Sequence, residues 1–167
     1  DRLLMSFHGL PQSTFLAGDP YHCQCHKTAR LLARALELNE SEWQVSFQSR
    51  VGRAAWLKPY TDKTLEIWGR KHGGLVDVIC PGFAVDCLET LEEIAIENAM
   101  LFQASGGKGL RYISALNARE DHLAFLLRTF VENLGGWPEA SPTYSASGKS
   151  AQEKESLTRA RKMGASI

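Results

Sequence analysis

The chain has 167 residues, which is enough for one domain with a real hydrophobic core and too few for two full domains. Hydrophobic residues make up 44% and charged residues 23%, as in ordinary soluble globular proteins. Lys plus Arg and Asp plus Glu both number 19, so the formal net charge is zero, which argues against a nucleic-acid partner. No apolar run approaches the roughly 20 residues that span a bilayer.

The chain opens directly on an apolar segment, residues 3–7, without an initiator Met or a signal-peptide pattern. We therefore expect a fragment whose upstream half is missing. The cysteines do not indicate an extracellular disulfide framework, because a chain of this size needs no such bridges. A cytoplasmic location is the expected one. The cysteines are Cys23, Cys25, Cys80 and Cys87.

Strand and helix patterns alternate along the chain. Apolar and alternating runs predict strands at residues 3–8, 43–48, 75–80 and 110–116. Apolar residues at helical spacing predict helices that start at Asp19-Pro20, at residue 61, at residue 85 and at residue 117, and that end near residues 38, 73, 104 and 133. Strands separated by helices imply βαβ crossovers. The expected fold is therefore α/β, a three-layer sandwich with a four-stranded parallel sheet and helices on both faces.

Residues 140–167 differ from the rest of the chain. They are rich in Ser, Ala, Lys and Glu and hold few large apolar residues. Such a segment buries too little surface to offset its ordering entropy. We expect a polar, disordered tail after a domain at residues 1–139, with a short helix over residues 151–163 as the alternative.

Ligands of parallel α/β sheets bind at the carboxyl ends of the strands, which directs attention to the loops there. His8 ends the first predicted strand. A histidine bonded to the backbone is the more common role for any single His, but this position favours a functional one. The loop after the second strand begins with Gln48, Ser49 and Arg50 and continues to Trp56 and Tyr60. With Phe7, Tyr21 and Phe83 these residues could line a flat apolar slot, although ordinary packing explains each one singly.

A ladder of carboxylates follows the third predicted strand. Asp86, Glu89, Glu93 and Glu97 recur at spacings of three and four, which places them on one helical face. An acidic stripe is usually a solvated face. Here it starts after a Pro-Gly turn at the ligand edge, where carboxylates bind divalent cations or accept protons. A local π-bulge would be typical of a functional helix of this kind.

The Cys23-x-Cys25-His26 run resembles half of a metal site, but its spacing matches no standard zinc or iron–sulfur pattern well. A structural metal is therefore the less favoured interpretation of these cysteines.

Six segments, in this order, resemble the second half of ferrochelatases over about residues 1–139: SFHGLP, GDPYHCQC, SFQSRVG, WLKPYT, PGFAVDCLETLEEI and SALN. The resemblance implies two similar α/β domains of chelatase-like, Rossmann-like topology, with the porphyrin in the cleft between them. It implies insertion of Fe²⁺ into protoporphyrin IX, the last step of haem synthesis. The missing N-terminal half would then be a partner of this chain.

The resemblance also implies residue roles. His8 matches an active-site histidine that serves as metal ligand or as base for the pyrrole protons, and Glu89 matches its carboxylate partner, so both are predicted to contact the metal. Glu93 and Asp86 match an acidic helix face that passes metal or protons. The residues implied to line the porphyrin cleft are Tyr21, Gln48, Ser49, Trp56 and Phe83.

Cys87 departs from the animal and some bacterial members, which carry His at this position. Some members hold a [2Fe–2S] cluster through cysteines that include C-terminal ones. The tail of this chain has no Cys, so we expect no cluster and no permanently bound cofactor, with Fe²⁺ as a substrate only. A hydrophobic substrate is compatible with loose contact at a membrane surface.

Two other interpretations stay open. Small single-domain cobalt chelatases that act on sirohydrochlorin dimerise to build a similar cleft, and a stand-alone domain of this length could do the same. A non-catalytic porphyrin-binding module is the third interpretation.

Overall fold

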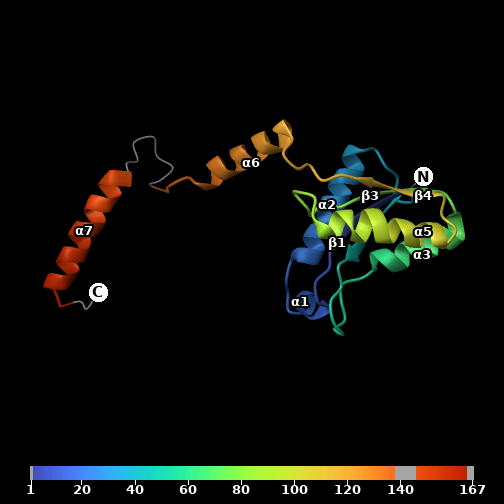
Figure 1. Cartoon of the computed structure of the whole chain (residues 1–167), viewed down its shortest axis with the longest axis horizontal. Coiled ribbons are helices and arrows are strands. Elements are labelled where there is room, and N and C mark those ends of the chain that lie inside the picture. Colours follow the sequence, from blue (N-terminus) through green and yellow to red (C-terminus); the bar gives the residue numbers. More distant parts are fainter. Residues whose placement is uncertain (1, 138–145, 165–167) are drawn as a thin grey trace. The chain divides into compact units, whose positions relative to one another are not determined.

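The structure is a computed structural model that describes residues 2–137 and 146–164 (Figure 1). The chain divides into two compact units, Asp1–Ala118 and Arg119–Ile167. The first unit holds all four strands and carries the predicted site residues.

The sheet of the first unit is parallel throughout, with strand order β2-β1-β3-β4. It confirms the predicted four-stranded α/β fold. The fourth strand ends earlier than residue 116, where the sequence placed its end. The strands are β1 (Arg2–His8), β2 (Trp43–Gln48), β3 (Leu75–Ile79) and β4 (Gly109–Ile113).

Helices connect these strands. They are α1 (Gln12–Leu16), α2 (Tyr21–Ala35), α3 (Thr61–His72), α4 (Leu88–Leu91), the π-helix η1 (Glu93–Asn98) and α5 (Ala99–Ala104). The short α1 lies between the strand predicted at residues 3–8 and the helix predicted to start at Asp19-Pro20. At the start of α2 the N-cap residue is Pro20, and the Asp19 carboxylate before it accepts a hydrogen bond from the Tyr21 backbone N–H at 2.8 Å.

Alternation along β1 builds the three layers. Met5 and Phe7 pack with α2 on one face of the sheet, and Leu4 packs on the other face. The α2 face holds Met5, Phe7, Cys25, Ala29, Ala33, Val45, Phe47 and Leu57. The opposite face, under α3, η1 and α5, holds Leu4, Leu65, Trp68, Val76, Val78, Cys80, Ile94 and Phe102. Both faces of the sheet are thus covered, as parallel sheets require.

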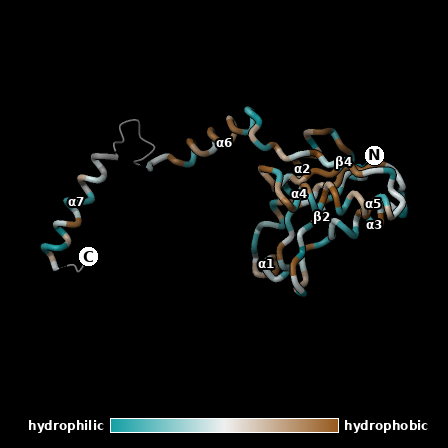
Figure 2. The backbone as a smooth tube through the Cα atoms, viewed as in Figure 1, coloured by the Kyte–Doolittle hydropathy of each residue, from teal (hydrophilic) through white to brown (hydrophobic). Residues whose placement is uncertain are grey.

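The second unit contains α6 (Glu120–Asn133) and α7 (Ala146–Lys162). Helix α6 begins three residues after the predicted start at residue 117, and it carries more hydrophobic residues than α7 (Figure 2). Helix α7 covers residues 151–162 of the short helix that was the alternative for residues 151–163. Residues 140–145 and 165–167 of the predicted tail lie outside the described residues, so the proposed disorder there stays a prediction.

A search of the described residues finds no helix that is both long enough and apolar enough to cross a membrane. The cytoplasmic location stays a prediction.

Candidate active site

The candidate site lies at the carboxyl ends of β1, an inner strand of the sheet, and its neighbour β2, an edge strand. His8 and Gln48 are the last residues of β1 and β2, and they pair directly in the parallel register. Above them is an open pocket of about 500 Å³. Its walls come from the β2–α3 loop on one side and from α4 and η1 on the other. The lining residues are His8, Ser49, Arg50, Val51, Leu88, Glu89, Glu92, Glu93 and Glu97.

The orientation of the His8 ring is fixed by a contact to its own loop. Nδ1 lies 2.7 Å from the backbone oxygen of Gly9. Because a carbonyl only accepts hydrogen bonds, Nδ1 must carry the proton. In the neutral ring the lone pair is then on Nε2. The half-buried His8 therefore has one nitrogen that is ready to accept a proton or bind a metal.

Tyr21, at the start of α2, contacts the backbone of His8. Its hydroxyl donates to the backbone oxygen of His8 at 2.8 Å. Burial raises the pKa of Tyr21 well above its ordinary value, so the hydroxyl keeps its proton and remains a donor. The ring of Phe83 lies on another side of His8, with 6.4 Å between the ring centroids. Tyr21 and Phe83 thus hold the strand end and imidazole in place.

Glu89 shares the pocket with His8 and is half-buried. Hydrogen bonds from the Cys87 side chain and from the Glu89 backbone lower the pKa of Glu89 below its ordinary value. Glu89 is therefore ionised at neutral pH. Cys87 thus supports the carboxylate of Glu89.

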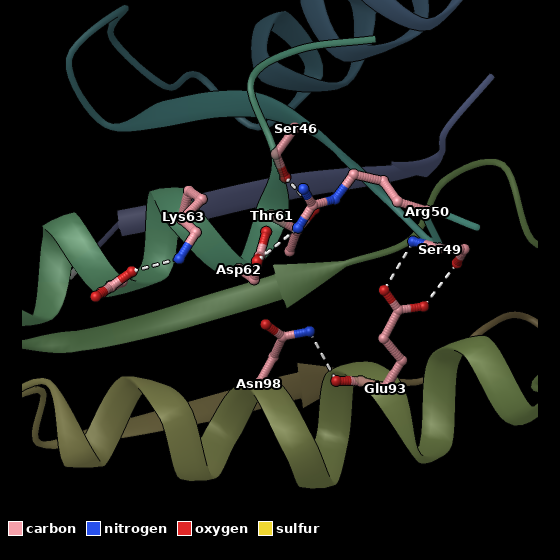
Figure 3. A network of polar contacts seen from close by, with 9 residues as sticks. Ser46, Ser49, Arg50, Thr61, Asp62, Lys63, Glu93 and Asn98 are labelled. Atoms are coloured by element: carbon pink, nitrogen blue, oxygen red, sulfur yellow. Dashed lines mark hydrogen bonds and ion pairs between the residues drawn. The ribbon is translucent and has the colours of Figure 1, made fainter. Parts of the chain in front are cut away.

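Glu93 is held by the end of β2, in contrast to Glu89. Its carboxylate accepts hydrogen bonds from the Ser49 backbone N–H at 2.7 Å and from the Ser49 hydroxyl at 2.6 Å (Figure 3). A longer contact of 3.4 Å comes from Gln48 Nε2. Ser49 has a positive φ of 62°, which costs a non-glycine residue about 1 kcal/mol. This conformation lets a single residue present two donors to Glu93.

The helix that carries these acids has the local widening that the sequence suggested. Over Glu93–Asn98 it is a π-helix, and the Glu97 N–H bonds to the Glu92 oxygen five residues earlier at 2.9 Å. The buried Asn98 amide donates to the Glu93 backbone oxygen at 2.7 Å (Figure 3). Sequence reasoning missed Asn98. The side chain stabilises the widened turn beside the pocket, where such turns are often functional.

Asp86 is turned away from this pocket. It precedes α4, because the helix starts at Leu88 and not at residue 85 as predicted. Burial alone would raise the pKa of Asp86, but four hydrogen bonds hold it below its ordinary value. The donors are Tyr112 Oη at 2.7 Å, Asn117 Nδ2 at 2.7 Å, the Ala115 N–H at 3.1 Å and Thr90 Oγ1 at 3.2 Å. Asp86 ties the loop after β4 to the start of α4, and its predicted part in substrate binding stays a prediction.

Trp56 and Arg50 shape the loop after β2. Trp56 donates from Nε1 to the Val51 oxygen at 3.1 Å. Its ring packs on the Gly9 backbone, where an added Cβ would lie only 3.1 Å from the ring and 2.8 Å from the Gln48 oxygen. Arg50 pairs with Asp62 at 2.7 Å (Figure 3). These contacts hold the loop against the strand end that carries His8.

The cysteines form no metal site of their own. All four are free thiols, with Cys25 and Cys80 buried and Cys23 exposed. Within residues 2–137 and 146–164, no group of three or more His, Cys, Asp or Glu side chains is arranged to hold a metal ion. His8 and Glu89 would thus leave most coordination positions of a bound ion to other ligands.

Comparison with known proteins agrees with the resemblance noted in the sequence. The family model for ferrochelatase matches residues 1–134. The chain belongs to the ferrochelatase family. Ferrochelatase of Thioalkalivibrio sulfidiphilus is 55% identical over 164 residues, which cover 98% of this chain and 44% of that protein. Ferrochelatase of Nitrosococcus oceani is 58% identical over 140 residues, or 84% of this chain and 38% of that protein.

A third relative, the ferrochelatase of Janthinobacterium, is 48% identical over 165 residues, or 99% of this chain and 45% of that protein. The chain therefore spans less than half the length of these ferrochelatases. It corresponds to their C-terminal portion.

Of the residues that the ferrochelatase resemblance singled out, the structure brings His8, Ser49, Glu89 and Glu93 together around one pocket. Gln48 lies beneath them. Tyr21, Trp56 and Phe83 contact the loops that build the pocket, and Asp86 faces the β4 loop.

Proposed function

We propose that this chain is the half of a ferrochelatase that carries the proton acceptor His8 and the metal-facing carboxylate Glu89. With the remaining half it inserts Fe²⁺ into protoporphyrin IX and forms haem. Family membership supports this function, and so does one observation above all. His8 and an ionised Glu89 line the same pocket at the carboxyl edge of the sheet.

His8 removes the pyrrole protons in this proposal. Insertion requires that the porphyrin lose its inner N–H protons, so a base must stand beside the ring. The Gly9 contact leaves Nε2 of the neutral imidazole with a lone pair, and Tyr21 fixes the backbone of the same residue. His8 is thus oriented for proton transfer before any substrate arrives.

Glu89 meets the hydrated Fe²⁺. Carboxylates bind the hydrated forms of hard and borderline divalent cations, and Glu89 is ionised and faces the pocket. Glu93 is less suited to carry the metal, because three donors already engage its carboxylate. Its part is to hold η1 against the end of β2. Glu89 is therefore the carboxylate that receives the metal in this proposal.

The other half of the enzyme would complete the porphyrin cleft. The pocket is open, and Val51 and Leu88 are exposed at its rim. A macrocycle bound there would cover these side chains and would need a second wall. No permanently bound cofactor takes part, and an iron–sulfur cluster is not required. The reaction needs no nucleic-acid partner. Loose contact with a membrane surface is compatible with a hydrophobic substrate.

A reconstitution experiment tests this function. The chain is incubated with protoporphyrin IX and Fe²⁺ without oxygen, alone and with the N-terminal half of the Thioalkalivibrio sulfidiphilus ferrochelatase, and the porphyrin spectrum is followed. Haem should form only when both halves are present.

Insertion by the chain alone would contradict the need for a second half and favour a self-complementing chelatase dimer. No insertion by the mixture, with circular dichroism that shows a folded chain, would leave a porphyrin-binding module in place of the enzyme.

A further inference from the structure

A group of buried polar residues lies directly beneath the pocket. Ser6, Ser46, Gln48 and Thr61 have exposed fractions between 0% and 2%. Since side chains alternate along a strand, Ser6 shares a face of β1 with His8, and Ser46 shares a face of β2 with Gln48. Polar groups buried this deeply are costly unless they are hydrogen-bonded. Their partners therefore indicate what the group is for.

The hydroxyl groups form a continuous chain that ends on Gln48. Ser6 donates to Gln48 Oε1 at 2.7 Å. Thr61 Oγ1 lies 2.8 Å from Ser6 Oγ. It donates to Ser46 Oγ at 2.9 Å (Figure 3). Because Ser6 gives its only proton to Gln48, the Thr61 proton is shared between Ser6 and Ser46. Thr61 thus keeps the Ser6 hydroxyl turned towards Gln48.

Cys80 supplies a second donor to the same oxygen. Its sulfur lies 3.4 Å from Gln48 Oε1. Burial raises the pKa of Cys80 to about 12, so the group remains a thiol and can donate. With two donors on Oε1, the amide nitrogen of Gln48 must face the other way.

The amide nitrogen reaches the helix that carries the acids. Gln48 Nε2 donates to the Glu89 backbone oxygen at 2.6 Å and to the Glu93 carboxylate at 3.4 Å. A flipped amide would place Oε1 against these two acceptors, which is repulsive. The buried hydroxyls and thiol thus select the one amide orientation that joins the sheet to the α4–η1 segment.

We propose that Ser6, Thr61 and Cys80 are positioning residues, which fix the Gln48 amide and through it hold Glu89 and Glu93 at their distance from His8. None of the three lines the pocket, so they act through Gln48 and not on the substrate. The activity readout of this inference rests on the proposed function. The spectroscopic readout does not.

Two Thr61 variants separate positioning from packing. Thr61→Val keeps the shape and removes the hydroxyl, whereas Thr61→Ser keeps the hydroxyl and removes a methyl group. If Thr61 positions Gln48, Thr61→Val in the reconstituted enzyme lowers kcat about tenfold with little change in KM for porphyrin, and Thr61→Ser stays near wild type. The reverse order, or equal losses, would mean that Thr61 only packs. Ser6→Ala and Cys80→Ala should follow Thr61→Val in direction.

A double-mutant cycle tests whether the effect runs through Gln48. In a Gln48→Met background, Thr61→Val should cause no further loss of kcat. A full, additive loss would overturn the proposal. Circular dichroism and thermal unfolding show in parallel that each variant is folded at the assay temperature.

Nuclear magnetic resonance tests the same point without any porphyrin chemistry. In the whole chain, the side-chain amide protons of Gln48 should exchange slowly with solvent, and Gln48→Glu identifies their signals. Ser6→Ala and Thr61→Val should shift these signals and speed their exchange at least about tenfold, while Thr61→Ser should not. Unchanged Gln48 signals in Ser6→Ala would refute the positioning role, even if insertion activity is absent from all samples.

Discussion

Ser49 donates both its backbone N–H and its hydroxyl to the carboxylate of Glu93, at 2.7 and 2.6 Å. The pair joins the end of β2 to the first residue of η1. The left-handed backbone of Ser49 is used to make both contacts. Glu93 therefore fixes one wall of the pocket relative to the strand that ends beside His8.

Removing the charge of Glu93 should loosen this wall. Glu93→Gln replaces one acceptor oxygen by a donor, which then faces a Ser49 donor. Because hydrogen bonds to charged groups contribute about 1.5–3 kcal/mol, we expect the free energy of unfolding to fall by about that amount. Urea denaturation measures it. Glu97→Gln, at an exposed carboxylate of the same helix, should change it by less than about 0.5 kcal/mol. Equal effects of the two substitutions would argue against the anchoring role.

Asp86 should make stability depend on pH. Its pKa is lower in the folded chain than in the unfolded one, so it stabilises the fold above the unfolded-state pKa. This contribution is lost as the pH falls through the folded-state pKa. Asp86→Asn should therefore have a lower free energy of unfolding than wild type at pH 7. This difference in free energy should become smaller in strong acid.

Urea denaturation at neutral and acidic pH measures the difference in free energy of unfolding between Asp86→Asn and wild type. Glu40→Gln, at an exposed turn residue, is the matched control and should show no such difference at either pH. A difference for Asp86→Asn that stays constant with pH would show that the lost contacts do not depend on the charge.

Gly9 should not tolerate a side chain. A Cβ there would lie 2.8 Å from the backbone oxygen of Gln48 and 3.1 Å from the Trp56 ring. Gly9→Ala should cost about 1–3 kcal/mol in stability and shift His8, since the loop after β1 must move. Thermal unfolding gives the loss. Gly82→Ala, whose Cβ would meet the Phe7 ring at 3.4 Å, should cost clearly less. A fully stable Gly9→Ala chain would mean that the loop is not held as described.

The layout of the sheet was predictable because each strand has a signal in its own short stretch of sequence. Apolar runs and turn residues mark all four strands, and βαβ connections leave a parallel sheet as the expected arrangement. The acidic ladder after a strand and a Pro-Gly turn made a π-bulge an open expectation, but nothing in the sequence placed it at Glu93–Asn98. The position of His8 at the ligand edge came from the strand end itself.

The spacing of the acidic residues could not predict that the Asp86 side chain points away from the pocket. The ladder rule assumes that the helix includes Asp86, but contacts with Tyr112 and Asn117, more than 20 residues further along the chain, hold it outside. The buried network under Gln48 was missed for a similar reason. Its one sequence signal was Ser6, a polar residue inside an apolar strand, and its partner Thr61 lies 55 residues away.

The central claim is that His8 takes the porphyrin protons in a two-half ferrochelatase. The most direct test compares initial rates of Fe²⁺ insertion by wild type and His8→Ala, each mixed with the N-terminal half, with His72→Ala as an exposed control. We predict that His8→Ala is slower by at least about 100-fold and that His72→Ala matches wild type. Near-normal insertion by a folded His8→Ala chain would contradict the account.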